Sequence, residues 1–193
     1  MSGFKIHDVS TAPADSRDIL ITLQEKAGFV PNVFGLIANA PVALAALAAV
    51  NNGFEETSFT PAEREIISLA TSVENQCRYC VAGHSTFAVA LGVSPVEVEA
   101  IRSGKAAEDQ RLEALRHFTS LLLQKKGGVS TRDIETFLGA GFEEAHIFEL
   151  LIGIIAKVMT NFASKLARIP VDDEFADHAW VPTTDMIKDK NAA

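Results

Sequence analysis

Apolar residues recur every three or four positions along most of the chain, which is the spacing that places them on one face of an α-helix. Capping residues, prolines and glycines mark where these segments begin and end. The pattern predicts helices over residues 16–26, 32–39, 42–56, 61–74, 77–91, 94–102, 111–126, 130–139 and 143–167. The alternation of a β-strand does not extend over a useful length anywhere in the sequence. We therefore predict an all-α protein with one domain over residues 1–193.

Two of these predicted helices have features that bear on the fold. The helix over 61–74 begins with a capping box, in which Thr60 caps the helix, Glu63 caps back three residues later, and Pro61 takes the first helical position. The helix over 143–167 is apolar on nearly all sides. A helix with that pattern is expected to be buried.

The composition, with 48% hydrophobic and 22% charged residues, is that of a globular protein. A formal net charge of −8 argues against a nucleic-acid partner, because phosphate binding needs a basic surface. Residues 27–54 are uncharged and long enough to span a membrane, but prolines and asparagines interrupt them, so we predict two buried helices there. The N-terminus lacks the apolar run of a signal peptide. We expect a cytoplasmic protein with no membrane partner.

The two cysteines of the chain, Cys77 and Cys80, lie close together, and His84 follows one helical turn later. Residues three and four apart share a face of a helix, so the three side chains form one stripe. Two thiols at this spacing can close a disulfide with little movement of the backbone. In a reducing compartment, such a pair is more often catalytic or metal-binding than a structural disulfide.

The thiolate is the reactive form of cysteine, and two features could generate it here. Free N–H groups at the start of the helix stabilise an anion near Cys77, whereas His84 can accept a proton from Cys80. The effect of the helix end is worth about 0.3–1 kcal/mol at exposed sites. A positioned base typically accelerates a reaction by roughly 10²–10⁴-fold. We therefore predict that Cys80 is the attacking sulfur and Cys77 the resolving one.

A histidine that moves protons is commonly oriented by a carboxylate. The preceding helix offers Glu63, Glu65 and Glu74. Glu63 already belongs to the capping box, and Glu74 lies in the last turn, where the helix dipole disfavours a negative charge. Glu65 lies at the edge of the apolar face. Helical angles alone do not choose decisively among the three.

The spacing of these residues resembles the signature of the carboxymuconolactone decarboxylase / alkylhydroperoxidase D superfamily, in which a glutamate, eleven residues, Cys-x-x-Cys, three residues and a histidine follow one another. Glu65, Cys77, Cys80 and His84 form this signature here, and the likeness extends over residues 61–91. Longer, peroxidase-related members are also similar in outline, through Pro31-Asn32-Val33-Phe34 early in the chain and Asn161-Phe162 and Pro170-Val171-Asp172 late in it.

The resemblance implies an AhpD-like helical bundle that assembles as a homo-oligomer, commonly a trimer or hexamer. It also implies a thiol-dependent peroxidase, in which Cys80 attacks a hydroperoxide and Cys77 resolves the product to a disulfide. His84 would relay the proton, with Glu65 behind it through a water. An external dithiol, such as a lipoyl group, would restore the thiols, and this scheme needs no metal, haem or flavin. The chain departs from alkylhydroperoxidase D at Tyr79, where that protein has an additional histidine.

Other interpretations fit the same residues. The cysteine pair could serve a redox sensor or a protein disulfide reductase. A lactone decarboxylase is less favoured, because that branch of the superfamily lacks the cysteine pair. Cys77, Cys80 and His84 could also bind zinc, with Glu65 or a water as the fourth ligand. Finally, the thiols could be buried and unreactive.

Three predictions concern residues that are not part of the signature chemistry. Tyr79, the one tyrosine of the chain, is predicted to pack in the core. Phe175 and Trp180 are predicted to anchor the C-terminal segment to the core or to a neighbouring subunit. The polar tail over residues 187–193 is predicted to fray.

Overall fold

The computed structural model describes residues 3–182. These form a single helical domain with α1 (Ala14–Ala27), α2 (Asn32–Ile37), α3 (Pro41–Glu55), α4 (Pro61–Glu74), α5 (Arg78–Ala90), α6 (Pro95–Arg102), α7 (Gln110–Gln124), α8 (Thr131–Gly139), α9 (Glu144–Ala167) and the 3₁₀ helix η1 (Asp173–His178). The all-α prediction is confirmed, and the ends of the predicted helices lie within two residues of the observed ones. The short helix η1 was not predicted. The tail over 187–193 lies outside the described residues.

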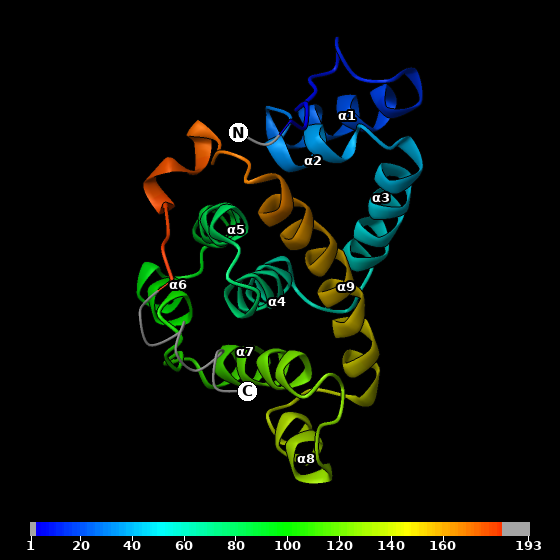
Figure 1. Ribbon diagram of the computed structural model, residues 1–193. Coiled ribbons are helices and arrows are strands. Elements are labelled where there is room, and N and C mark those ends of the chain that lie inside the picture. The colour runs from blue at the N-terminus through cyan, green and yellow to red at the C-terminus, as the bar shows by residue number, and fades with distance from the viewer. Residues whose placement is uncertain (1–2, 183–193) are drawn as a thin grey trace.

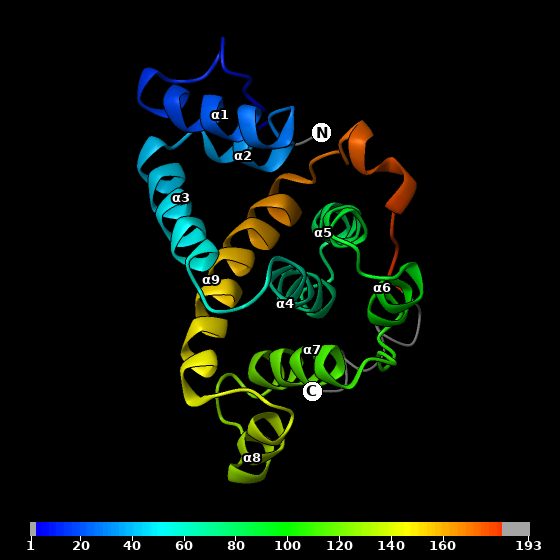
Figure 2. The same cartoon turned by 180° about the vertical axis from the view of Figure 1, so that it is seen from behind.

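Helix α4 lies at the centre of the domain, with α5, α7 and α9 packed around it (Figure 1, Figure 2). Its side chains from Ile66 to Val73 are all buried, including three polar ones. Ser68, Thr71 and Ser72 can be buried because each hydroxyl donates to the carbonyl four residues earlier. Because its polar groups are satisfied internally, α4 can be enclosed on all sides, and it forms a rigid support for the segment that follows it.

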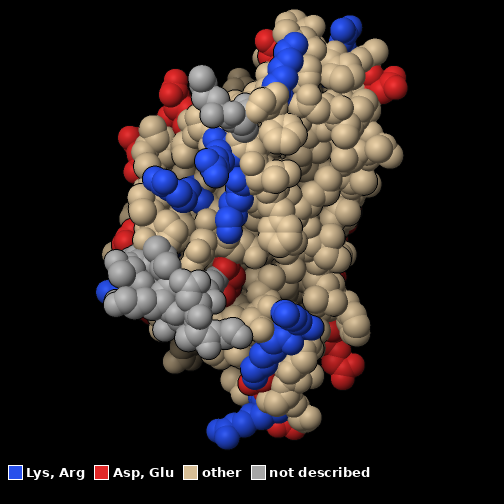
Figure 3. Space-filling model, viewed as in Figure 1, with Lys and Arg blue, Asp and Glu red and all other residues tan. Residues whose placement is uncertain are grey.

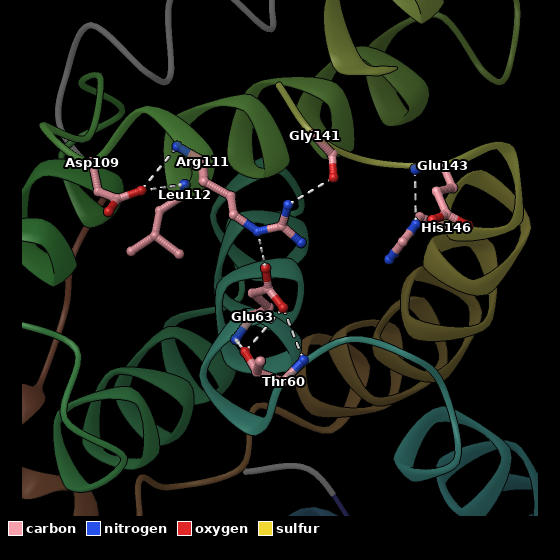
Figure 4. Close-up of polar contacts among 8 residues, drawn as sticks. All are labelled: Thr60, Glu63, Asp109, Arg111, Leu112, Gly141, Glu143 and His146. Carbon is pink, nitrogen blue, oxygen red and sulfur yellow. Dashed lines mark hydrogen bonds and ion pairs between the residues drawn. The ribbon is translucent and has the colours of Figure 1, made fainter. Parts of the chain in front are cut away.

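The N-terminus of α4 is fixed by the predicted capping box and by a link to α7 (Figure 4). The Thr60 hydroxyl accepts from the Glu63 N–H at 3.2 Å, and the Glu63 carboxylate accepts from the Thr60 N–H at 2.8 Å. The second carboxylate oxygen of Glu63 accepts from Nε of Arg111 at 2.6 Å, and Arg111 also donates to the Gly141 carbonyl. Burial would raise the pKa of Glu63, but these hydrogen bonds outweigh it and lower that pKa. Glu63 is thus occupied by structural contacts.

Two hydrophobic clusters fill the domain. The larger joins α4 to the helices that follow it, and the smaller joins α1, α2 and α3 to α5 and η1. Phe175 of η1 is buried in the smaller cluster, and Trp180 is buried in the larger one, where its indole donates to the carbonyl oxygen of Arg102. The prediction that these two aromatic residues anchor the C-terminal segment to the core is confirmed.

The prediction that the helix over 143–167 is buried on nearly all sides is wrong for its outward face. The inward face of α9 packs against α3 and α4. The outward face carries an apolar row whose side chains are 59% to 74% exposed, namely Phe148, Ile155, Phe162 and Leu166. In Figure 3 the surface over α3 and α9 has few charged side chains. By length and composition alone α9 could also span a membrane, although in this fold its inward face is covered by the domain.

Candidate active site

The cysteine pair is positioned by the short turn between α4 and α5. Gln76 adopts a left-handed backbone conformation, with φ of 52°, and Cys77 then becomes the N-cap of α5. Asn161 of α9 holds this turn from the side. Its side-chain oxygen accepts from the Asn75 amide at 2.9 Å, and its own amide donates to the Ser72 hydroxyl at 3.2 Å. The turn is therefore fixed by α9 as well as by its own backbone.

Both cysteine side chains are buried, and they are not joined by a disulfide. The Cys77 thiol donates to the Cys80 sulfur, and the two sulfurs are 2.6 Å apart, compared with about 2.05 Å in a disulfide. The Cys80 N–H donates to the Cys77 sulfur at 3.3 Å, and the Ser164 hydroxyl lies 3.7 Å from the Cys80 sulfur. The pair therefore needs little movement to form a disulfide.

The surroundings distinguish the two sulfurs. Burial by itself would raise the pKa of the Cys80 thiol, but hydrogen bonds from Cys77 and from Asn161 and Ser164 outweigh it. The charge of Lys157 acts in the same direction, so the pKa of Cys80 is lowered. For Cys77, the hydrogen bond to Cys80 and burial both raise the pKa. Cys80 is thus the sulfur that ionises first, and the helix start does not reverse this order.

His84 is paired with Glu65, which helical angles alone could not establish. Nδ1 of His84 lies 2.7 Å from Oε2 of Glu65, a direct contact where the resemblance implied a bridging water. The other two candidates have different partners, since Glu63 caps α4 and Glu74 accepts from the side chain of Gln124. Burial lowers the pKa of His84, and the Glu65 charge opposes that effect only in part. The imidazole is therefore neutral near pH 7 and can accept a proton at Nε2.

His84 and the sulfurs share a cavity but not a hydrogen bond. Among the described residues, His84 forms no hydrogen bond to Cys77 or to Cys80, although helical spacing suggested direct contact with Cys80. Instead, His84 and Cys80 both line a cavity of about 60 Å³. A proton that passes between them must therefore be carried by a molecule inside this cavity.

A second cavity, of about 350 Å³, adjoins the first. The residues common to both walls are Phe34, His84, Phe87 and Lys157. Cys80 lines the smaller cavity, which we call the inner cavity, and Glu65 lines the larger one, which we call the outer cavity. The reactive thiol and the carboxylate thus lie on opposite sides of a wall that contains the histidine.

Tyr79 takes the position of the additional family histidine and has a structural role. Its hydroxyl donates to the Asp172 carboxylate and accepts from the Val33 N–H at 3.4 Å. Asp172 also accepts from the Asn32 N–H at the start of α2. Burial, followed by the contact with Asp172, raises the pKa of Tyr79 well above its ordinary value. The prediction that Tyr79 packs in the core is confirmed, and its hydroxyl ties α2 and the segment before η1 to α5.

The polar residues that α9 contributes to the site were not predicted from the sequence as site residues. Lys157, Thr160, Asn161 and Ser164 are all buried on the inward face of this helix. They follow one another at intervals of three, one and three residues, which places them on one helical face. Four polar residues on one face of an otherwise apolar helix are a signal that could have identified this part of the site.

The ligands of the zinc alternative are not brought together. Between residues 3 and 182, the structure contains no group of three or more His, Cys, Asp or Glu side chains that could hold a metal ion. Glu65 is paired with His84, and His84 does not hydrogen-bond to the sulfurs. The four side chains proposed as ligands therefore do not form a tetrahedral site.

The fold and the site together define a class of protein. It is an all-helical domain in which an unbonded Cys-x-x-Cys pair at the start of a helix shares a cavity with a histidine held by a glutamate. Comparison with known proteins identifies that class. The model of the carboxymuconolactone decarboxylase family matches residues 40–122. No protein of curated function matches the sequence.

Solved structures share the fold over nearly the whole chain. An uncharacterised peroxidase-related protein from Ralstonia eutropha JMP134, described as an alkylhydroperoxidase AhpD core, has a TM-score of 0.82 and 26% identity, covering 94% of this chain and 98% of that one. A second uncharacterised peroxidase-related protein, from Silicibacter sp. TM1040, has a TM-score of 0.76 and 23% identity, covering 90% and 92%. The debrominase Bmp8, as a cysteine-to-alanine variant in complex with 2,3,4-tribromopyrrole, has a TM-score of 0.78 and 13% identity, covering 92% and 96%.

The family match and these structural neighbours support the AhpD-like superfamily, which the cysteine, histidine and glutamate signature predicted. The family match and the AhpD-like neighbours suggest an enzyme related to peroxidases. At 13% identity, the likeness to the debrominase shows a common fold alone.

Proposed function

We propose that this protein is a thiol-dependent peroxidase that reduces organic hydroperoxides with electrons from an external dithiol. One observation carries the proposal. Cys80 has a lowered pKa, its partner thiol lies 2.6 Å away, and it opens on the cavity that His84 lines. This arrangement provides an ionisable nucleophile and a base that line one cavity, with a resolving thiol next to the nucleophile.

In the first step, His84 takes the proton of Cys80 through the hydroperoxide in the inner cavity. The Cys80 thiolate then attacks the terminal oxygen, so that a sulfur–oxygen bond forms and the oxygen–oxygen bond breaks. The electron pair of the broken bond goes to the oxygen of the organic group, which takes a proton from His84 and leaves as an alcohol. Glu65 holds the imidazole at Nδ1, so that Nε2 carries out both transfers.

In the second step, the Cys77 thiol attacks the sulfur of the Cys80 sulfenic acid. A disulfide forms and water leaves, which the short distance between the sulfurs allows without rearrangement of α5. An external dithiol, such as a lipoyl group, then reduces the disulfide by thiol–disulfide exchange. The sum of the steps is one hydroperoxide and two thiols giving one alcohol, one water and one disulfide.

The walls of the inner cavity favour a small apolar substrate. The cavity has a volume of about 60 Å³, and the rings of Tyr79, Phe87 and Phe175 form part of its lining. Phe175 meets Phe87 and Tyr79 in edge contacts, so these rings support one another. We infer that the substrate is a hydroperoxide whose organic group is small enough to lie against these rings.

The apolar row on α9 supports assembly as a homo-oligomer, a trimer or a hexamer in the family pattern. Phe148, Ile155, Phe162 and Leu166 lie on one helix and are 59% to 74% exposed. An apolar patch of this kind on a folded domain commonly marks a protein interface. We infer that a second copy of the chain covers this row in a cytoplasmic oligomer.

A second candidate reaction, suggested by the ligand of the structurally similar debrominase, is reductive debromination of a bromopyrrole. It has the same electron balance, since a carbon–bromine bond and two thiols give a carbon–hydrogen bond, bromide, a proton and a disulfide. The aromatic walls of the inner cavity are also suited to a flat ring. Release of bromide from 2,3,4-tribromopyrrole in the presence of a dithiol tests this candidate.

A redox sensor or a protein disulfide reductase would use the same cysteine pair at a different rate or on a different substrate. A sensor is oxidised once and recycles slowly, whereas a peroxidase turns over many times with excess reductant. A decarboxylase-like lyase would not need the thiols. Comparison of turnover in the parent with that in thiol variants therefore separates all three from a peroxidase.

The deciding experiment measures consumption of a small organic hydroperoxide with dithiothreitol, dihydrolipoamide or thioredoxin as the reductant. We expect multiple turnovers in the parent, no turnover in Cys80→Ser, and a trapped sulfenic acid at Cys80 in Cys77→Ser. The two variants are matched, because each removes one buried thiol of the same pair. A Cys80→Ser protein that is as fast as the parent would end the proposal.

A further inference from the structure

Lys157 is a buried cation that none of the steps above uses. It lies in the middle of α9, and only 8% of its surface is exposed. Within residues 3–182, its ammonium group has no hydrogen bond or ion pair. Burial of a charged group without a partner is unfavourable, and such groups are uncommon in protein interiors. An unpaired buried lysine therefore needs an explanation outside folding stability.

The position of Lys157 provides that explanation, because it lines both the inner cavity with Cys80 and the outer cavity with Glu65. The titratable or charged groups around these two cavities are Lys26 on α1, Glu55 on α3, Arg64 and Glu65 on α4, and Tyr79, Cys80 and His84 on α5. Among the described residues that line the inner cavity, Lys157 is the one lysine or arginine. An anion that forms in this cavity therefore has Lys157 beside it.

Two groups that line the cavities, Glu65 and Cys80, could provide an anionic partner for the Lys157 ammonium group. The Glu65 carboxylate is already bound by His84 at 2.7 Å. The Cys80 sulfur has hydrogen-bond contacts with Cys77 and Ser164, but none with a cationic side chain among residues 3–182. Burial lowers the pKa of Lys157, while the charges of Glu65 and Cys80 oppose that effect. Conversely, the charge of Lys157 contributes to the lowered pKa of Cys80 and also lowers the pKa of His84, which keeps His84 neutral as a base.

We propose that Lys157 is a catalytic cation of this site, which stabilises the Cys80 thiolate and then the negative charge on the oxygen that leaves the hydroperoxide. When Cys80 has lost its proton, the Lys157 ammonium group balances the anionic sulfur across the inner cavity. As the sulfur–oxygen bond forms and the oxygen–oxygen bond breaks, the charge moves from sulfur to the leaving oxygen, and Lys157 stays beside it. His84 then supplies the proton. The second part of this role rests on the proposed peroxidase function, and the first part does not.

The test measures the alkylation rate of Cys80 by iodoacetamide as a function of pH, with peptide mass spectrometry to separate Cys80 from Cys77. No peroxide is present, so the result does not depend on the proposed function. In Lys157→Met, the pH midpoint of Cys80 alkylation is expected to move upward, and alkylation at pH 7 slows about tenfold for each unit of movement. Lys157→Arg keeps the charge and is expected to restore the midpoint toward that of the parent.

Lys105→Met is the matched control, because it removes one positive charge from an exposed loop residue that lines neither cavity. Its alkylation profile is expected to match the parent. A thermal melt accompanies each variant, and Lys157→Met is expected to be at least as stable as the parent, since it removes an unpaired buried charge. Lys157→Gln provides a second neutral variant if Lys157→Met does not fold.

The outcomes separate the two proposals. If neutral variants at Lys157 leave the alkylation midpoint of Cys80 unchanged, the role of Lys157 is overturned, whatever the peroxidase assay gives. If the midpoint moves but the parent consumes no hydroperoxide, the thiolate role stands and the peroxidase function fails. If the midpoint moves and the parent turns over, kcat/KM for the hydroperoxide is expected to fall in Lys157→Met. The fall should be by a larger factor than the decrease in the thiolate fraction of Cys80, because the leaving oxygen also loses its cation.

Discussion

Helix α9 buries Leu150 and Ile154 in the usual way, but four residues on each of its faces reverse the usual arrangement of a helix in a soluble domain. The face turned inward carries Lys157, Thr160, Asn161 and Ser164, all of them buried. The face turned outward carries Phe148, Ile155, Phe162 and Leu166, all of them more than half exposed. The hydrophobic effect normally sorts these residue types in the opposite way. The proposed site accounts for the polar residues on the inside of the helix, and the proposed oligomer accounts for the apolar residues on the outside.

The contrast teaches that burial and importance for folding are different properties on this helix. The inward polar residues organise the turn before Cys77 and the environment of Cys80. The outward apolar residues contribute less to the isolated domain, since more than half of each residue's surface is uncovered in the described chain. Their contribution is expected to come from association with a second copy. Each face can therefore be tested separately from the other.

The largest expected effect concerns the outward face. In the double variant Ile155→Glu with Phe162→Glu, two charges replace two exposed apolar side chains of α9. If a second copy covers this row, burial of the unpaired charges weakens assembly by about 2–5 kcal/mol. The protein is then expected to become a monomer. Sedimentation equilibrium measures the change, with circular dichroism to show that the helices remain. An oligomer that persists in the variant places the interface elsewhere.

The next largest effect is expected from a comparison of Asn161 and Phe162, which are neighbours in the sequence but lie on opposite faces of α9. Asn161→Ala removes the side chain that bonds Asn75 and Ser72, and it leaves these buried groups without partners. The expected loss in the free energy of unfolding is about 2–3 kcal/mol. Phe162→Ala, measured on the monomer, is expected to change it by less than about 0.5 kcal/mol. Urea unfolding at low protein concentration measures both, and the account of the two faces fails if the aromatic residue proves the more important one.

A third comparison separates two glutamates that lie two positions apart on α4. Glu65→Gln is expected to lower kcat/KM for the hydroperoxide about 10–100-fold, because His84 loses the carboxylate that orients it. Glu63→Gln is expected to leave turnover nearly unchanged and to lower the free energy of unfolding by about 1–2 kcal/mol, through the cap and the Arg111 contact. The reverse pattern would show that the carboxylate roles are assigned to the wrong residues.

The smallest effect is a dependence of stability on pH. The pKa of His84 in the folded protein lies below its ordinary value of 6.5. As pH falls below 6.5, the unfolded chain binds a proton more readily than the folded one, so the free energy of unfolding decreases until the pH has passed below the folded-state pKa of His84. Carboxylates with lowered pKa values, such as Glu63 and Glu113, affect stability only below their ordinary value of 4.5. In His84→Asn, the free energy of unfolding should depend less on pH just below 6.5. An unchanged dependence on pH would contradict the burial of a neutral imidazole.

Much of the fold could be predicted from the sequence because its helices carry local signals. Thr60 and Glu63 form the capping box that their spacing predicts, and α4 has the predicted bounds. The motif likewise predicted that Cys77 would begin a helix and that His84 would lie near Cys80, since both relations are local. These features depend on residues within a turn or two of each other, where sequence spacing determines geometry.

The rest depended on contacts between distant parts of the chain. The choice of Glu65 follows from how α4 packs against α5, which a helical wheel of one helix does not show. Lys157 and Asn161 reach the site from a helix about eighty residues later, and an apolar composition concealed their common face. The exposure of Phe162 could not be predicted either, because composition alone does not tell a core helix from one that meets a partner.

The central claim is that Cys80 is the reactive thiolate of this site, and its reactivity in the parent protein tests that claim most directly. The measurement follows iodoacetamide labelling of each cysteine in the reduced protein from about pH 5 to about pH 10, in steps of about one pH unit. Mass spectrometry quantifies the label on each cysteine. The account predicts that Cys80 is labelled first, with a midpoint below the ordinary cysteine value of 9.0, and that Cys77 follows much later. Labelling of Cys77 before Cys80, or of Cys80 only at and above pH 9.0, would contradict it.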